Sequence, residues 1–421
     1  MLFSILCSLF ITLVFGGNTD NPYTGKTVYV QQAYVNEVQI SINLHPSMAS
    51  TLKKYQNVPV FYWIDSMARI DNLTTVLEGA MNEQKSNNTK VVVQIIIYDV
   101  PDRDCAAAAS NGEITCANDA CEQGIETYKT QYIDPIVTLL KKYPDLTIVA
   151  LIEPDSLPNL ATNMNVQKCA QAQTAYLTCI PYAIQQLATL DNVWMYVDAA
   201  HGGWLGWPDN MQKFVQIIQQ VLQTAGTSIY NIYIYIYIYI ITHIRNIYIL
   251  YIGGNDLVRG FASNTANYQP LGSITSTDDY CDLKSQYNDC INEAIYIQYM
   301  DQEMTSAGIT GKGYITDTAR NGVPGARTHQ ESCGGPCCEW CNIDGTGFGN
   351  FPSTDTSSTG IPNLIDSFVW AKVPGESDGT SNTSASNYDY HCGSDESLKP
   401  APQAGQWFDA FFVMLAQNAP N

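Results

Sequence analysis

The sequence predicts an α/β fold built around a parallel sheet or barrel. Short apolar runs suited to buried strands recur along the chain, and segments with helical spacing lie between several of them. This alternation is typical of parallel sheets, because each strand needs a crossover connection back to the same edge. The predicted strands are 91–98, 146–152, 193–197, 313–316 and 368–372, and the predicted helices are 126–143, 168–190 and 211–224.

The chain contains 421 residues, enough for one large domain or a few smaller ones. No Pro- or Ser-rich linker divides it, and the Ser/Thr/Gly-rich stretch 350–361 is short enough to be a loop. Hydrophobic residues make up 45% of the sequence, which allows a full core. We therefore expect a single domain without internal repeats.

The first residues, MLFSILCSLFITLVFGG, form an apolar run followed by small residues. This pattern is typical of a secretory signal peptide, although no Lys or Arg precedes the apolar run. A buried N-terminal helix is the alternative. We expect residues 1–17 to be a signal peptide, 18–421 to be the mature domain, and the protein to be secreted to the extracellular space. Three N-x-S/T sequences would then be candidate glycosylation sites, at Asn72, Asn87 and Asn382.

The charge balance is strongly acidic, with 40 Asp and Glu against 20 Lys and Arg and a formal net charge of −20. This argues against nucleic acid or an anionic membrane as a partner, because both carry negative charge. A neutral or cationic ligand remains compatible with the charge.

Thirteen cysteines are present, and the removal of Cys7 with the signal peptide would leave an even number. In a secreted chain this indicates disulfide bonds. A cluster near the C-terminus would suit zinc in a cytosolic protein, whereas disulfides fit a secreted one better. No other metal-ligand spacing occurs, so we expect neither a metal nor a cofactor. The members of the cluster are Cys333, Cys337, Cys338 and Cys341.

Carboxylates follow several of the predicted strands, and two of these stretches also contain tryptophan. Facing carboxylates suit glycoside hydrolysis, and tryptophan rings suit the C–H faces of sugars. The alternatives are helix caps or turns for the aspartates, and core packing for the tryptophans. The stretches are YDVPDRDCAAAASNGE with Tyr98, Asp99, Asp102 and Asp104; LIEPDSLPNLATN with Glu153 and Asp155; YVDAAHGGWLGWPDN with Asp198, His201, Trp204 and Trp207; and VWAKVPGESDGTSN with Lys372, Glu376 and Asp378.

Taken together and in order, these stretches resemble glycoside hydrolase family 6, the cellobiohydrolases and endoglucanases that cut β-1,4-glucan with inversion. The resemblance runs from about Pro59 to the C-terminus. It implies the distorted seven-stranded parallel β/α barrel of that family, as a single catalytic domain with active-site loops. Further matching stretches are VPVFYWIDS, VRGFASNTANYQ, EWCNIDGTGFG and PAPQAGQWFDAFF.

The resemblance implies a role for each matched residue. Asp155 would be the general acid, and Asp104 the neighbour that raises the pKa of the acid and assists water, because two close carboxyls cannot both ionise easily. Tyr98 would lie beside the sugar at the cleavage point. Asp378 matches the aspartate debated as the catalytic base, for which a water chain is often proposed. The implied substrate-binding residues are the sugar-stacking Trp63, Trp204, Trp207 and Trp340 and the polar Asp198, His201, Asn264, Lys372 and Glu376.

Two disulfides are implied by matching positions, Cys105–Cys169 and Cys341–Cys392, each anchoring a loop over the active site. Cys116 and Cys121 would clip an extension of the first loop, and Cys281 and Cys290 would form a local pair. Two departures from the family pattern are Ala200 and Ala319, which stand where glycines are usual.

Loop length favours an exo-acting enzyme, because the loop from Asp378 to Cys392 is shortened in endo-acting relatives and is full length here. We therefore expect a monomeric cellobiohydrolase that releases cellobiose from the non-reducing ends of cellulose or another β-1,4-glucan. The alternatives are an endoglucanase of the same family and a non-catalytic glucan-binding protein. No cellulose-binding module is seen.

Residues 227–254, which include NIYIYIYIYIIT, interrupt the resemblance. The alternation of Tyr and Ile has the period of a strand, but both faces would be apolar, which is an aggregation hazard. A TA dinucleotide repeat would translate as this run, so a retained intron or an expanded repeat explains its composition. We expect an aberrant insertion that leaves the barrel as a loop or irregular hairpin without a substrate role.

Overall fold

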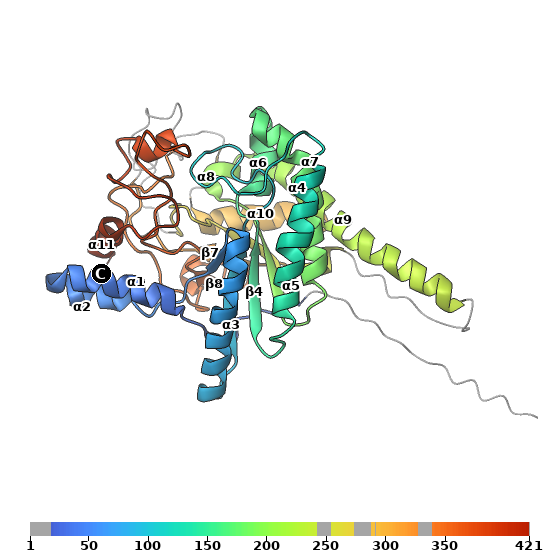
Figure 1. Cartoon of the computed structure of the whole chain (residues 1–421), viewed down its shortest axis with the longest axis horizontal. Helices are drawn as coiled ribbons and strands as arrows, with labels where there is room; N and C mark the ends of the chain where they lie inside the picture. Colours follow the sequence, from blue (N-terminus) through green and yellow to red (C-terminus); the bar gives the residue numbers. More distant parts are fainter. Residues whose placement is uncertain (1–17, 242–253, 273–287, 291, 327–338, 421) are drawn as a thin grey trace, which may run out of the picture.

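A curled sheet of parallel strands forms the centre of the protein in the computed structural model (Figure 1). The structure describes residues 18–241, 254–272, 288–290, 292–326 and 339–420. The strand order is β1-β3-β4-β5-β6-β7-β8, and β2 pairs with β3. The strands are β1 (Thr27–Val28), β2 (Tyr62–Ile64), β3 (Val91–Ile97), β4 (Thr147–Ile152), β5 (Val193–Asp198), β6 (Gly260–Ser263), β7 (Gly313–Asp317) and β8 (Ile365–Val369).

The strands β1 and β2 share one position in the sheet. β1 pairs with the start of β3 and β2 with its end, while β4 occupies the other edge of β3. The sheet therefore has seven positions, which confirms the predicted distorted seven-stranded parallel barrel. Between β2 and β8 no strand pairing occurs within the described residues, but the amide of Phe61 donates to the carbonyl of Trp370 at 3.2 Å.

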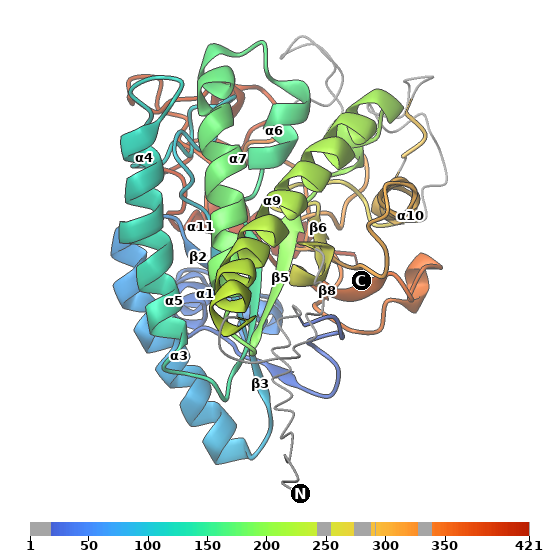
Figure 2. The ribbon, with the colours of Figure 1, turned by 90° about the vertical axis from the view of Figure 1, so that its right-hand side faces the viewer.

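Helices cover the outer face of the sheet. Figure 2 shows α3, α5, α7 and α9 side by side there, as expected when each crossover returns the chain outside a right-handed parallel sheet. The helices are α1 (Gln32–Leu44), α2 (Ala49–Leu52), α3 (Met67–Asn87), α4 (Glu122–Thr127), α5 (Asp134–Leu140), α6 (Ser156–Thr162), α7 (Gln167–Leu187), α8 (Gly202–Leu205), α9 (Pro208–Ile241), α10 (Glu293–Ser306) and α11 (Asp409–Asn418).

The core lies on both faces of the strands. Along β3, Val93 and Ile95 pack outward under the helices, whereas Val92 and Ile96 pack inside the barrel. This alternation follows from the two-residue period of a strand, and burial on both faces explains the continuous apolar runs that predicted the sheet. None of the described helices is long and apolar enough to cross a membrane.

Two predicted elements have different bounds. The helix predicted at 126–143 is divided, because a π-helical segment, η3 (Tyr128–Ile133), lies between α4 and α5. The strand predicted at 368–372 begins earlier, at Ile365. Its start contains Asp366, a polar residue that is buried because Arg259 and Tyr196 donate hydrogen bonds to it inside the barrel. A search for runs of apolar residues therefore misses the start of this strand.

The prediction of a loop or irregular hairpin at 227–254 is wrong for residues 227–241, because α9 continues to Ile241 (Figure 1). A helix satisfies the backbone hydrogen-bonding groups within the segment itself, whereas a strand would need a partner. Residues 242–253 lie outside the described residues.

Candidate active site

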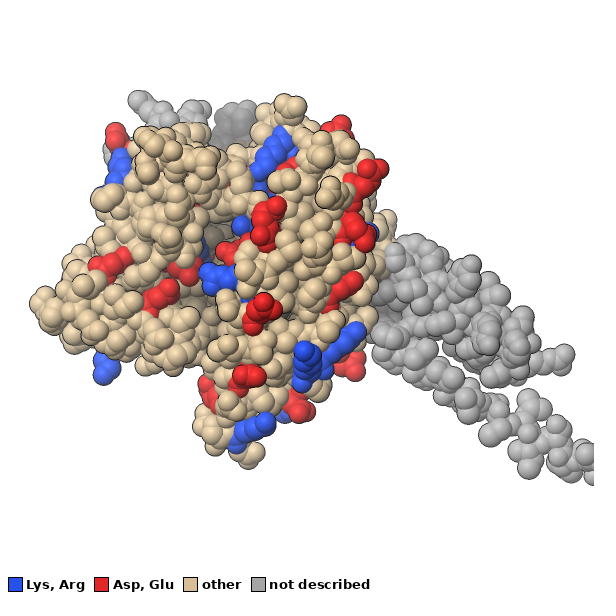
Figure 3. Space-filling model, in the orientation of Figure 1, with Lys and Arg blue, Asp and Glu red and all other residues tan. Residues whose placement is uncertain are grey.

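A cavity of about 990 Å³ lies at the C-terminal edge of the strands. Figure 3 shows a hollow in this face of the molecule, with acidic and basic side chains around it. Because the strands are parallel, the residues that follow β3, β4, β5 and β8 meet at this edge. All but two of the predicted catalytic and substrate-binding residues line the cavity: Trp63, Tyr98, Asp104, Asp155, His201, Trp204, Trp207, Trp340, Lys372, Glu376 and Asp378.

Several residues at this edge have left-handed backbone conformations. The φ angles are +55° at Asp104, +65° at Asp155, +49° at Ala200 and +59° at Asn264. A left-handed backbone conformation costs a residue other than glycine about 1–2 kcal/mol of conformational energy. Such strain concentrates at functional sites. The positive φ at Ala200 also explains why glycine is usual there, whereas Ala319 is free of this strain.

Asp155 carries a carboxyl in the cavity whose surroundings favour the protonated form. Although it keeps some exposure, desolvation raises its pKa well above the usual range, and the charges of Asp198 and Asp104 raise it further. Its backbone amide donates to Oδ2 of Asp198 at 3.0 Å. The site therefore holds a proton donor at the end of β4.

Asp104 lies on the loop after β3. Its Oδ2 accepts a hydrogen bond from the amide of Ser110 at 3.0 Å. Burial raises the pKa of Asp104, while the Ser110 hydrogen bond and the nearby Lys168 and Arg103 act in the opposite direction. The carboxyl is thus held in a fixed orientation, and within the described part of the chain it forms no close ion pair.

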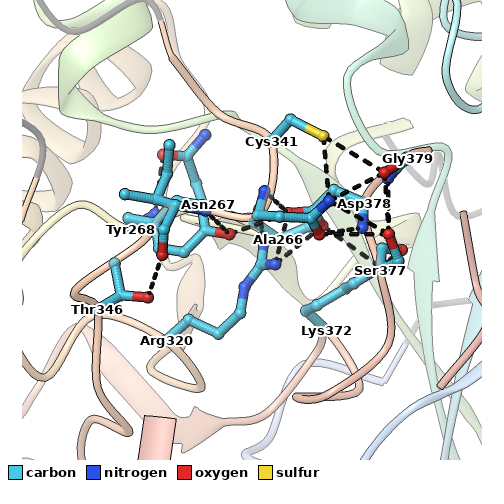
Figure 4. Close-up of polar contacts among 12 residues, drawn as sticks. Ala266, Asn267, Tyr268, Arg320, Cys341, Thr346, Lys372, Ser377, Asp378 and Gly379 are labelled. Carbon is cyan, nitrogen blue, oxygen red and sulfur yellow. Dashed lines mark hydrogen bonds and ion pairs between the residues drawn. The ribbon is translucent and has the colours of Figure 1, made fainter. Parts of the chain in front are cut away.

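Asp378 is bound from several sides (Figure 4). Nη1 of Arg320 lies 2.8 and 2.7 Å from its two oxygens, and Nζ of Lys372 lies 3.5 Å from Oδ1. The amide of Asn342 and the hydroxyl of Tyr268 donate to Oδ2 at 2.8 and 2.9 Å. Burial alone would raise the pKa of Asp378, but these cations and donors lower it. The carboxylate is therefore ionised and a weak base.

Arg320 is a residue of this site that sequence reasoning did not assign. Its side chain is 0% exposed, and its guanidinium stacks on the ring of Tyr268 at 4.2 Å from the centroid. Arg103 was missed as well; it lines the cavity and stacks on Tyr98 at 4.5 Å. The position of Arg103 within DRDC was the one available signal, whereas Arg320 is 58 residues from Asp378 in sequence.

The four predicted tryptophans are partly exposed at the cavity, not packed in the core. The indole Nε1 of Trp63 donates to the carbonyl of Ala371 at 2.9 Å, and that of Trp204 to Oγ1 of Thr162 at 2.7 Å. These bonds fix the rings while leaving one side open. An amphipathic ring held in this way suits contact with a sugar.

Asp198 and Asn264 do not line the cavity. Asp198 is buried and accepts hydrogen bonds from the amides of Asp155 and Ala200. Asn264 is 0% exposed, and its amide group bonds to the backbone of Gln269 and Asp317. In this structure both residues support the site from behind; neither reaches the space that a ligand would fill.

Two loops meet across the cavity and form one continuous wall. The amide of Ala108, after β3, donates to Oδ2 of Asp389, after β8, at 2.9 Å. Nδ2 of Asn387 donates to the carbonyl of Ala109 at 3.3 Å. Residues beside this contact line the cavity, among them Ala107, Ala109, Asn387 and Tyr390, so the two loops are joined at the cavity wall.

Comparison with known proteins identifies the family. The sequence model of "Glycosyl hydrolases family 6" matches residues 23–232 and 245–419. The chain belongs to glycoside hydrolase family 6. It is 41% identical to 1,4-beta-D-glucan cellobiohydrolase C of Emericella nidulans and 40% identical to Exoglucanase 3 of Agaricus bisporus, in each case over 95% of this chain and 79% of the relative.

Solved family 6 structures have the same fold. The catalytic core domain of the cellobiohydrolase Cel6A from Chaetomium thermophilum superposes with a TM-score of 0.80 at 38% identity, covering 96% of this chain and 99% of that one. Cellobiohydrolase II (Cel6A) from Humicola insolens, solved with glucose and cellotetraose, superposes with a TM-score of 0.80 at 35% identity, covering 95% and 99%.

The disulfides of this family 6 chain agree with prediction in three cases. Cys105–Cys169, Cys341–Cys392 and Cys116–Cys121 are formed. The first two anchor the loops that meet across the cavity. Because Cys341 pairs with Cys392, it is not available as a zinc ligand.

The predicted Cys281–Cys290 pair is wrong, because Cys290 is a free, buried thiol. Its Sγ lies 3.6 Å from the carbonyl of Gly206, beneath the segment that carries Trp204, and burial raises its pKa to about 12. Cys333, Cys337 and Cys338 lie outside the described residues. The described part of the chain contains no group of three or more His, Cys, Asp or Glu that could hold a metal ion.

Proposed function

We propose that this chain is an exo-acting cellobiohydrolase that hydrolyses β-1,4-glucan with inversion and releases cellobiose from non-reducing ends. The observation that carries the proposal is the placement of the Asp155 carboxyl, whose pKa is raised by desolvation, beside Asp104 in a cavity lined by four partly exposed tryptophans. The names of the relatives, cellobiohydrolase and exoglucanase, support the same activity.

Asp155 acts as the general acid in this proposal. A glycosidic oxygen is a poor leaving group unless it receives a proton as the bond to the anomeric carbon breaks. The raised pKa of Asp155 keeps that proton available at a pH where an ordinary aspartate would have lost it. Trp63 is partly exposed and contacts the buried ring of Tyr98, with 5.4 Å between the centroids, and this pair would bind the sugar on the other side of the bond.

Water attacks the anomeric carbon from the face opposite Asp155, which inverts the configuration and needs no covalent intermediate. Asp104 would receive the proton that this water loses, directly or through a second water. The pKa of Asp104 is raised by burial, so it is a stronger base than an ordinary aspartate, and Ser110 fixes its orientation.

We assign Asp378 an electrostatic role in place of direct proton transfer. Arg320 and Lys372 lower its pKa and occupy its oxygens, which makes it a poor acceptor for the proton of water. Its fixed negative charge, 7% exposed at the cavity wall, would stabilise the positive charge that develops on the sugar ring in the transition state.

Exo action is supported by the contact between the loops at Ala108 and Asp389, because loops that are joined beside the site would hinder internal segments of a glucan more than chain ends. A time course on a soluble β-glucan tests this. We expect cellobiose as the main early product with a slow loss of viscosity. Rapid viscosity loss would support an endoglucanase, and binding of glucan without turnover would support a non-catalytic protein.

The remaining features of the proposal concern the mature chain. We propose removal of residues 1–17, secretion, and action as a monomer; exposed side chains at Asn72, Asn87 and Asn382 would permit glycosylation. Residues 227–254 are proposed as an aberrant insertion without a role in substrate binding. The family model leaves residues 233–244 unmatched, which supports this proposal.

A further inference from the structure

Tyr390 is an exposed aromatic residue on the wall of the cavity. Its surface is 56% exposed, and it alone lines the cavity among the exposed large hydrophobic side chains of the described residues. The others, Ile40, Leu44, Tyr299 and Phe351, lie elsewhere on the surface. A single exposed aromatic needs no explanation by itself. The position of Tyr390 at the cavity is what calls for one.

The ring of Tyr390 continues a row of rings along the wall. Trp340 contacts His391 with centroids 5.5 Å apart, and His391 contacts Tyr390 at 3.9 Å. All three line the cavity, but the side chain of His391 is only 12% exposed. The two accessible surfaces of the row are therefore Trp340 and Tyr390, with His391 between them.

The backbone that carries Tyr390 is fixed on both sides. Tyr390 begins the short helix η8 (Tyr390–Gly393), whose N-cap Asp389 accepts from the amide of His391 through Oδ1 at 3.0 Å. The second oxygen of Asp389 accepts from Ala108 at 2.9 Å, on the loop that also carries Asp104. Cys392 is bonded to Cys341, next to Trp340. Because this backbone is already fixed, Tyr390 would lose little conformational entropy on binding a ligand.

We propose that Tyr390 is a further sugar-stacking residue, which binds a glucosyl unit farther along the chain than the unit at Trp340. The inference rests on the proposed function and adds to it a subsite that only longer substrates reach. A phenol ring packs against the C–H face of a pyranose, and its hydroxyl can bond to a sugar hydroxyl. Tyr390 positions the substrate and takes no part in bond cleavage.

Steady-state kinetics on cello-oligosaccharides of different length test the inference. With Tyr390→Ala we expect KM for cellohexaose to rise about fivefold, from the roughly 1 kcal/mol typical of an aromatic contact. The KM for cellotriose and kcat for both substrates should remain close to wild type. Tyr390→Phe retains the ring and should behave like wild type on cellohexaose. Tyr299→Ala, at an exposed tyrosine on α10 outside the cavity, is the matched control.

Equal KM values for wild type and Tyr390→Ala on cellohexaose would overturn the inference. An equal rise for cellotriose and cellohexaose, or a lower midpoint of urea unfolding, would assign Tyr390 a structural role and overturn it as well. If the wild-type chain hydrolyses neither substrate, the proposed function fails. Calorimetric binding of cellohexaose then tests separately whether Tyr390 stacks on a sugar. Weaker binding to Tyr390→Ala would support stacking, and equal binding would contradict it.

Discussion

Oδ2 of Asp198 accepts a hydrogen bond from the backbone amide of Asp155 at 3.0 Å, and the charge of Asp198 also raises the pKa of the Asp155 carboxyl. One buried side chain thus fixes the strained backbone of the proposed acid and keeps its proton in place. This hydrogen bond joins the end of β5 to the end of β4, so changes at Asp198 should alter the activity and its pH dependence.

Replacement of the acid should remove the reaction while leaving binding intact. Asp155→Asn keeps the size of the side chain but cannot donate a proton of comparable acidity, so kcat on unactivated glucan should fall about 10²- to 10⁴-fold. Calorimetry with cellotetraose should show binding within a few-fold of wild type. Asp71→Asn, on the exposed face of α3, is the control and should be fully active. Near wild-type turnover by Asp155→Asn would refute the role of Asp155.

The alkaline limb of the activity profile should depend on Asp198. Asp198→Asn keeps an oxygen for the amide of Asp155 but removes a negative charge that raises the pKa of Asp155. The acid then loses its proton at lower pH, and the alkaline limb of kcat/KM shifts to lower pH. The effect should be greatest above pH 6, because the pKa of Asp198 is itself about 6.

The matched control for this profile is Asp191→Asn, at an exposed aspartate before β5. Its alkaline limb should coincide with that of wild type. An unchanged limb in Asp198→Asn, or a shift to higher pH, would show that the charge of Asp198 does not govern the acid.

The buried ion pair between Arg320 and Asp378 should be essential for stability. Arg320→Met leaves the Asp378 carboxylate buried with Lys372 as the one nearby cation among the described residues, and should lower the free energy of unfolding by about 3–5 kcal/mol. Urea denaturation measures the change. The exposed pair between Lys399 and Asp395 provides the comparison, and Asp395→Asn should have no measurable effect. A loss in Arg320→Met no larger than that of the surface variant would contradict the account.

Stability should decrease as pH rises, because burial favours the protonated form of several carboxyls. Burial raises the pKa of Asp99 from 3.8 to about 8. The folded state therefore holds a proton that the unfolded state has lost between these values. Its contribution to stability is present below about pH 4 and disappears as pH rises through 8. Glu376, whose pKa is also raised to about 8, acts in the same direction.

Asp99→Asn removes this titration while keeping a neutral side chain of the same size. Urea unfolding from acidic to alkaline pH should give a flatter stability profile for Asp99→Asn than for wild type, by up to about 1.4 kcal/mol per pH unit. Parallel profiles would show that Asp99 is already ionised in the folded state.

The sequence was sufficient for the parts of the fold and site that depend on local pattern. Buried strands such as β3 are long apolar runs, and residues that directly follow them, such as Asp155, are carried to the same edge by the parallel order. Asp366 shows the limit of such local patterns, because this charged residue inside the barrel is stabilised by its distant partners Arg259 and Tyr196. No local pattern in the sequence reveals that pairing.

The other differences between prediction and structure also arise from contacts that form only in the folded chain. Asn264 stands in a matching motif, but its amide is used to hold the backbone at Gln269, a hydrogen bond that only the folded loop creates. Arg320 becomes part of the site through an ion pair across 58 residues, and Tyr390 through its place beside His391. The alternation of Tyr and Ile indicated a strand, yet α9 continues through it to Ile241, because a helix needs no partner.

The central claim is an inverting, exo-acting hydrolysis with Asp155 as the acid. The most direct measurement is time-resolved proton NMR of cellotetraose hydrolysis by the wild-type chain, with the anomeric signals read before mutarotation equilibrates them. We expect cellobiose as the product, with the newly formed reducing end appearing first as the α-anomer. A first-formed β-anomer, or early release of glucose and cellotriose in place of cellobiose, would contradict the account.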